Sequence, residues 1–104
     1  MKDDIVAILE EKKVEDIEVV DVRTRSAFFD YFIIGTVESH KQSDAVVDEL
    51  KKGAIRIHHI ESTKESGWTL IDCFDVIVHL FTPEKRREYD LDSLWKNTLK
   101  TLNP

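Results

Sequence analysis

The sequence contains few of the residues that crosslink, break or loosen a chain. Its 104 residues include one cysteine, three glycines and two prolines. One cysteine cannot form a disulfide framework or a cysteine-rich metal site, and so little glycine and proline excludes collagen-like and low-complexity chains. The longest apolar run, Phe32–Val37, is far shorter than the ~18 apolar residues of a membrane-spanning helix. We therefore expect one compact domain over residues 1–104, with no membrane segment.

Acidic residues outnumber basic ones, and the excess lies in the first half. The chain has 15 Lys and Arg against 21 Asp and Glu, a formal net charge of −6. Residues 1–50 hold 6 basic and 13 acidic residues, whereas residues 51–104 hold 9 and 8. An acidic surface repels phosphate backbones, so it disfavours nonspecific nucleic-acid binding. It suits a basic protein partner, or it serves solubility alone.

The start of the chain and the lone cysteine bear on the compartment. The segment Met1–Asp4 is acidic where a secretory signal would be basic, and no small-residue cleavage site follows it. A lone cysteine suits a reducing environment. We therefore expect a cytoplasmic protein.

Hydrophobic periodicity predicts an α/β fold with a mixed sheet flanked by helices, in the order α-β-β-α-β-β-β-α. Asp3 or Asp4 is expected to cap the first helix, and Ser39-x-x-Gln42 has the spacing of a capping box for the second. Strands are expected at 17–22 and 28–37, an edge strand or extended connection at 55–57, and a hairpin over 68–81. Helical segments are expected at 84–88 and 91–102, the latter with Leu91, Leu94, Trp95 and Leu99 on one side.

The predicted hairpin carries the most informative side chains. Alternation places Trp68, Leu70 and Asp72 on one face of its first arm. In the second arm it separates Val76, Val78 and Leu80 from Asp75, Ile77, His79 and Phe81. Trp68 has the character of an interface anchor, and Phe74 at the tip would be costly to expose unless a partner covers it.

The sequence contains no pattern typical of a metal or cofactor site. There are four histidines, but His58 and His59 are adjacent and would point to opposite faces of a strand. No H-E-x-x-H or C-x-x-C spacing occurs. The three glycines lie too far apart to form a phosphate-binding loop. We therefore expect no metal and no cofactor.

Catalysis by side chains alone also has weak support. Cys73 lies beside Asp72, whose negative charge raises the pKa of a thiol and suppresses the thiolate. An acid–base set could be built from Asp72, Asp75 and His79 if the turn brought them together. Alternatively, the two aspartates polarise a tight turn.

Three sequence blocks resemble the Iojap-like family of ribosomal silencing factors, and the resemblance covers nearly the whole chain in order, from about Ile5 to Trp95. The first is Asp30-Tyr31-Phe32-Ile33-Ile34, followed by Ser39. The second is W-x-L-x-D-x-x-D-V-x-V-H-x-F, from Trp68 to Phe81. The third is R-x-Y-x-L-x-x-L-W, from Arg87 to Trp95.

The resemblance implies an α/β sandwich related to nucleotidyltransferases, in a factor that is not an enzyme. It implies binding to the large ribosomal subunit through ribosomal protein fourteen (uL14). Occupying that protein would sterically block joining of the small subunit and lower translation under starvation. Isolated members are often dimers. The partner-binding residues expected on this basis are Trp68, Asp72, Phe74, Asp75, His79 and Tyr89.

The chain departs from the family pattern around the hairpin turn. Family members usually have glycine where this chain has Phe74, an aromatic residue where it has Cys73, and Glu-Gly where it has Glu61-Ser62. Glycine takes a positive φ at no steric cost and phenylalanine does not, so we expect another turn type or a Phe74 that reaches the partner.

The relation to nucleotidyltransferases keeps an alternative, a small nucleotide-binding or nucleotidyltransferase-like enzyme. Such an enzyme needs a Gly-Ser turn at the start of a helix and a D-x-D metal pair. This chain has Gly35-Thr36, and its only D-x-D spacing is Asp90-x-Asp92, near the C-terminus.

Overall fold

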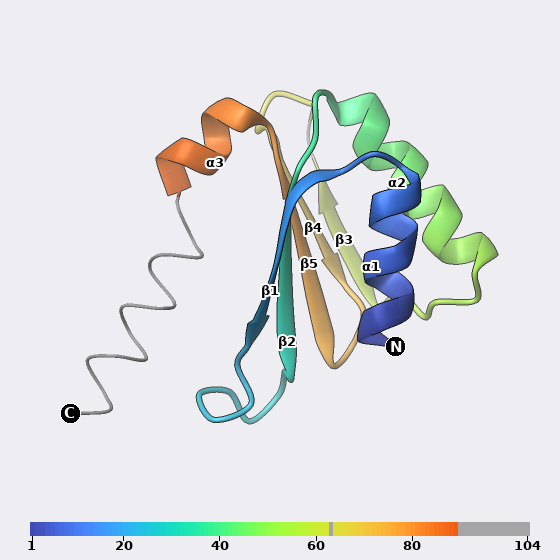
Figure 1. Ribbon diagram of the computed structural model, residues 1–104, viewed down its shortest axis with the longest axis vertical. Coiled ribbons are helices and arrows are strands. Elements are labelled where there is room, and N and C mark those ends of the chain that lie inside the picture. The colour runs from blue at the N-terminus through green and yellow to red at the C-terminus, as the bar shows by residue number, and fades with distance from the viewer. Residues whose placement is uncertain (63, 90–104) are drawn as a thin grey trace.

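The order of secondary-structure elements is the predicted one. The computed structural model describes residues 1–62 and 64–89. Within them the elements are α1 (Lys2–Glu11), β1 (Glu15–Asp21), β2 (Tyr31–Thr36), α2 (His40–Lys52), β3 (His59–Ser62), β4 (Trp68–Asp72), β5 (Val76–Phe81) and α3 (Pro83–Tyr89) (Figure 1). The expected helical segment at 91–102 lies outside the described residues.

The strands form one mixed five-stranded sheet in the order β1-β2-β5-β4-β3. Strands β2 and β5 are parallel neighbours at its centre, and the other pairs are antiparallel. The β4–β5 pair is the predicted hairpin, with Trp68 opposite Phe81 and Asp72 opposite Ile77. A parallel pair needs a long crossover between its strands, and here α2, β3 and β4 supply it.

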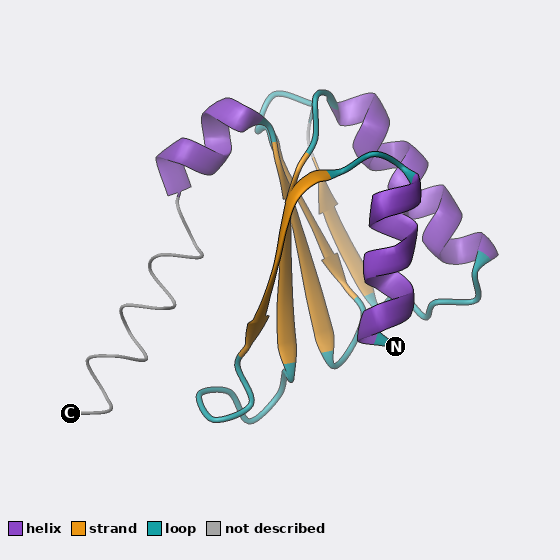
Figure 2. Ribbon diagram, viewed as in Figure 1, coloured by secondary structure: helices purple, strands orange, loops and turns teal. Residues whose placement is uncertain are grey.

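Both long helices cover the same face of the sheet. In Figure 2, α1 and α2 lie on one side of the strands, and α3 lies on the other side at one end. Ile5 and Leu9 of α1 and Val46 and Leu50 of α2 are buried against that face. The strands contribute the remaining members of this core, which include Ile33, Ile71, Val76, Val78 and Leu80. None of the described helices has the length and apolar character needed to cross a bilayer.

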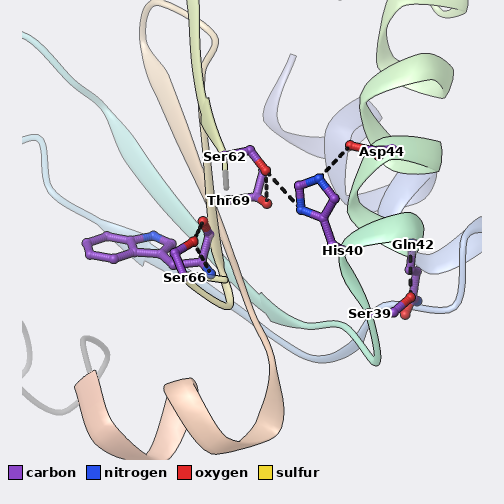
Figure 3. Close-up of polar contacts among 8 residues, drawn as sticks. Ser39, His40, Gln42, Asp44, Ser62, Ser66 and Thr69 are labelled. Atoms are coloured by element: carbon purple, nitrogen blue, oxygen red, sulfur yellow. Dashed lines mark hydrogen bonds and ion pairs between the residues drawn. The ribbon is translucent and has the colours of Figure 1, made fainter. Parts of the chain in front are cut away.

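The two helix starts differ in how well the sequence predicted them. Ser39 caps α2 as expected, because its side chain accepts from the backbone N–H of Gln42 at 3.3 Å (Figure 3). The amide of Gln42 reaches back to the N–H of Glu38 and also donates to the carbonyl of Lys12, which ties α2 to the end of α1. The expected Asp3 or Asp4 cap is wrong. Met1 is the N-cap, without a side-chain hydrogen bond, and both aspartates lie within the first helical turn.

One strand begins later than the sequence predicted, and residues 55–57 adopt the second of their two expected forms. The apolar stretch 28–37 yields a strand only from Tyr31, and Phe28 is 80% exposed. The Oγ of Ser26 accepts from the N–H groups of Phe28 and Phe29 and holds that segment in a turn. Residues 55–57 form the extended connection, and the edge strand follows at His59–Ser62.

Candidate functional site

The predicted site residues of the hairpin strands lie on the face of the sheet opposite α1 and α2, which we call the second face. It carries Phe32 and Ile34 of β2, Ile77, His79 and Phe81 of β5, and Trp68, Leu70 and Asp72 of β4. The predicted alternation in the hairpin is confirmed, because Val76, Val78 and Leu80 pack in the helix-covered core while Phe81 packs with Trp68. The sheet thus separates the residues that hold the fold from the candidate site.

Trp68 and His79 form the centre of the second face. The indole Nε1–H of Trp68 donates to Nδ1 of His79 at 3.2 Å. The indole also lies against the ring of Phe81, with centroids 5.1 Å apart. Trp68 is half-buried, so contacts on its inner side fix the ring and leave part of it accessible.

The hydrogen bond from Trp68 also sets the state of the His79 ring. Because Nδ1 accepts, the neutral ring carries its proton on Nε2. His79 is 5% exposed, and its Nε2 has no hydrogen-bond partner among the described residues. Burial lowers the pKa of His79 to about 4. His79 is therefore a neutral, buried residue that orients Trp68, and it is too enclosed to form a solvent-facing acid–base set with Asp72 and Asp75.

The β4–β5 turn contains three further predicted site residues. Oδ1 of Asp72 accepts from the backbone N–H of Phe74 at 2.9 Å, as in the turn-polarising alternative. Phe74 is 41% exposed and Asp75 is exposed. The carbonyl of Asp75 accepts from the N–H of Asp30 at 2.7 Å, which links the turn to the start of β2.

Of the two alternatives expected for Phe74, another turn type is wrong, and a contact with the partner stays a prediction. Phe74 has a φ of 72°, the conformation that glycine adopts at no steric cost. The aspartate hydrogen bond holds its backbone, and its ring gains contacts that glycine would lack. The guanidinium of Arg56 lies 4.9 Å from the ring centroid and the His58 ring lies 5.1 Å away. These contacts offset the backbone cost of about 1–2 kcal/mol.

This conformation predicts an unusual order of stability between two variants. Phe74→Gly should be more stable than Phe74→Ala by about 1 kcal/mol, since both lose the ring but only alanine keeps the strain at positive φ. The measurement is the free energy of unfolding in urea. Ala27 in the exposed β1–β2 loop, whose φ is not positive, is the matched position, and there Ala27→Gly should not stabilise. If the free energy of unfolding of Phe74→Ala equals or exceeds that of Phe74→Gly, the left-handed turn does not form in solution.

The structure divides the predicted site into two groups. Trp68 and His79 meet at one end of the hairpin, and Asp72, Phe74 and Asp75 lie at or beside the turn at the other end. The four residue steps of β4 separate the groups by about 13 Å. Tyr89 is the last residue of α3, and its side chain lies outside the described set.

Sequence reasoning missed a polar network on the helix-covered face (Figure 3). Nε2 of His40 lies 3.5 Å from Oδ1 of Asp44, and Nδ1 of His40 lies 3.3 Å from Oγ of Ser62. Ser62 also contacts Oγ1 of Thr69 at 2.8 Å. The four-residue spacing of His40 and Asp44 is visible in the sequence, but Ser62 reaches them only through the fold.

This network resembles a Ser-His-Asp arrangement in its order of contacts, but its surroundings favour a structural role. The adjoining cavity, lined by His40 and Thr69 among others, measures about 20 Å³, less than a substrate acyl group requires.

The remaining candidate groups for chemistry are also unfavourable. The Cys73 thiol is buried, and its pKa is raised to about 11, mainly by burial and to a smaller extent by the negative charge of Asp72. Among the described residues, no three His, Cys, Asp or Glu side chains are placed to share a metal ion.

A larger hollow of about 710 Å³ lies between β1, β2 and α3. Its lining includes Asp16, Glu18, Arg86 and Arg87, so its charges are mixed. Nη1 of Arg86 donates to Oγ1 of Thr36 at 2.9 Å and to the carbonyl of Asp16, which fastens α3 to the sheet. Opposed charges make this hollow a poor match for a nucleotide phosphate.

Comparison with known proteins identifies the family. The family model described as ribosomal silencing factor during starvation matches residues 1–103. The chain belongs to this family. The resemblance seen in the sequence is thereby confirmed, and the family is named for silencing ribosomes, not for a catalytic activity.

Individual relatives of this ribosomal silencing factor family member support the same assignment. The ribosomal silencing factor RsfS of Bacillus subtilis is 37% identical over 93 residues, covering 86% of this chain and 79% of the relative. That of Halalkalibacterium halodurans is 36% identical over 94 residues, covering 86% and 80%. A crystal structure of a protein from Chromobacterium violaceum has a TM-score of 0.78 and 30% identity, covering 88% of this chain and 80% of that one.

Proposed function

We propose that this chain binds the large ribosomal subunit through ribosomal protein fourteen and sterically blocks joining of the small subunit. The β4–β5 hairpin supplies the contact surface, with Trp68 as its apolar anchor and the acidic turn as its charged part. The protein acts by binding, without breaking a bond, among the ribosomes of the cytoplasm. The outcome is repression of translation when nutrients are limiting.

The fixed, half-exposed indole is the observation that carries this proposal. A tryptophan whose inner side is held by His79 and Phe81 loses little conformational freedom when a partner covers its outer part. The two turn aspartates extend the same hairpin toward solvent, and a chain of net charge −6 attracts a basic ribosomal protein. The family relationship supports a ribosomal partner over other basic proteins.

Removing charge at the turn should weaken binding without unfolding the hairpin. Asp75→Lys reverses an exposed charge, and Asp72→Asn keeps the side-chain oxygen that accepts from Phe74. We expect the double variant to bind purified large subunits about tenfold more weakly at low salt, with a smaller loss at high salt because the attraction is screened. Sucrose-gradient sedimentation of large and small subunits should also show more joined ribosomes than with the unaltered protein.

A matched control makes the same change of charge elsewhere. Asp48→Lys and Glu11→Gln alter exposed positions on α2 and α1, on the other side of the sheet. This double variant should bind within about twofold of the unaltered protein. Equal binding by the turn variant and the unaltered protein would remove the turn from the interface. Failure of the unaltered protein to sediment with large subunits would refute the proposed function.

A further inference from the structure

A small pocket lies on the second face between the edge strand β3 and β4. It has a volume of about 200 Å³ and is lined by Glu61, Ser62, Ser66, Trp68 and Leu70. Glu61 and Leu70 are direct cross-strand partners, so their Cβ atoms lie about 5 Å apart on the same face. Trp68 is two residues before Leu70 and shares that face. The pocket therefore adjoins the accessible part of the indole.

Glu61 supplies the negative charge of this pocket, and its other lining residues are uncharged. Leu70 and the indole supply apolar surface, and the Glu61 side chain is 71% exposed at the rim. Hydrogen bonds within the chain engage both serines. Ser66 Oγ bonds to the backbone of Trp68, and Ser62 Oγ bonds to Thr69 and His40 on the helix-covered face. The carboxylate of Glu61 lies 3.2 Å from Nε2 of the exposed His59, at hydrogen-bond distance.

We propose that this pocket receives an arginine side chain of the protein partner, and that Glu61 selects it. The methylene groups of arginine match Leu70, and its planar guanidinium can stack on the indole while donating two hydrogen bonds to one carboxylate. Lysine has no plane to stack, and an RNA phosphate would be repelled by Glu61. This assignment rests on the proposed function, because it names the chemistry of the partner group that meets Trp68.

The test uses a variant that keeps the shape of the pocket and removes its charge. Glu61→Gln should bind purified large subunits about tenfold more weakly at low salt, and its affinity should fall less steeply as salt rises. Glu65→Gln, an exposed acid in the β3–β4 loop outside the pocket lining, is the control and should bind within about twofold of the unaltered protein. Unchanged affinity and salt dependence in Glu61→Gln would overturn the assignment. So would tighter binding, which would indicate a phosphate in the pocket.

A second measurement separates this inference from the proposed function. Acetyl-arginine-amide titrated into the full chain should shift the indole N–H resonance of Trp68 and the methyl resonances of Leu70 in a saturable way. Acetyl-citrulline-amide, which has the same shape without the charge, should not, and Glu61→Gln should abolish the arginine shifts. Absence of arginine shifts in the unaltered chain would overturn the pocket assignment even if large subunits bind. If arginine shifts these resonances but the protein does not bind large subunits, the pocket assignment stands and the proposed function is refuted.

Discussion

Lowering the pH from 7 to 4 should remove about 3 kcal/mol from the free energy of unfolding through His79 alone. Burial lowers the pKa of His79 from an ordinary 6.5 to about 4 in the folded protein. The unfolded chain therefore binds a proton at this residue between those two values, whereas the folded protein does not. The contribution of the neutral His79 to the free energy of unfolding is present in full above pH 6.5. It is lost progressively as the pH falls to 4, and it changes little below that pH.

Urea unfolding at a series of pH values measures this loss. His79→Gln is the matched variant, because its side-chain oxygen can still accept from the indole N–H while it cannot titrate. The difference between the two stability curves isolates His79 from the carboxylates, and it should be steepest between pH 6 and 4.5, where the slope approaches about 1.4 kcal/mol per pH unit. An NMR titration of the His79 ring gives the pKa directly. A midpoint near 6.5 would contradict the burial and the neutral tautomer inferred for this ring.

Trp68→Ala should weaken binding to large ribosomal subunits about a hundredfold, the largest effect we expect from one surface change. The substitution removes an aromatic anchor at the centre of the proposed interface, where truncation costs about 2–4 kcal/mol. It also removes the donor to His79 and the contact with Phe81, so thermal unfolding of the variant has to be measured alongside binding. Binding is measured well below the unfolding temperature.

Two further variants keep this prediction decisive. Trp68→Phe retains a ring against Phe81 and should lose less affinity than Trp68→Ala. Phe28→Ala removes an aromatic ring that is 80% exposed in the β1–β2 loop, outside the hairpin strands, and should leave affinity within about twofold. If Trp68→Ala binds as well as Phe28→Ala, the indole belongs to the fold alone and another surface contacts the ribosome.

Sequence periodicity predicted the order of the elements because each long element has a buried side that repeats at its own period. Val46 and Leu50 mark the inner side of α2, and Val76, Val78 and Leu80 mark one side of β5. The predicted strand boundaries were wrong where local hydrogen bonds, and not apolar character, decide the backbone conformation. Phe28 is as apolar as the strand that follows, yet Ser26 turns the chain there. Strand pairing was also beyond periodicity, which gives no reason for β5 to lie beside β2.

The sequence predicted the members of the candidate site better than their arrangement. Trp68 and His79 are in contact, but their separation from the turn follows from the direction of β4, which side-chain types do not reveal. The positive φ of Phe74 contradicts residue preference, because the Asp72 hydrogen bond and the contacts of the Phe74 ring with the Arg56 guanidinium and the His58 ring act only in the folded turn. Glu61 could not be assigned to a pocket until the pairing of β3 with β4 placed it opposite Leu70.

The parallel contact between β2 and β5 also determines when this chain can fold during its own synthesis. The antiparallel pairs β1–β2 and β3–β4 join neighbours in sequence, so each can close as soon as it leaves the exit tunnel. Within the sheet, these two pairs are joined only through β5, the last strand among the described residues. Before β5 leaves the tunnel, the two strand pairs cannot be joined into one sheet. The sheet is therefore completed only after β5 has been translated.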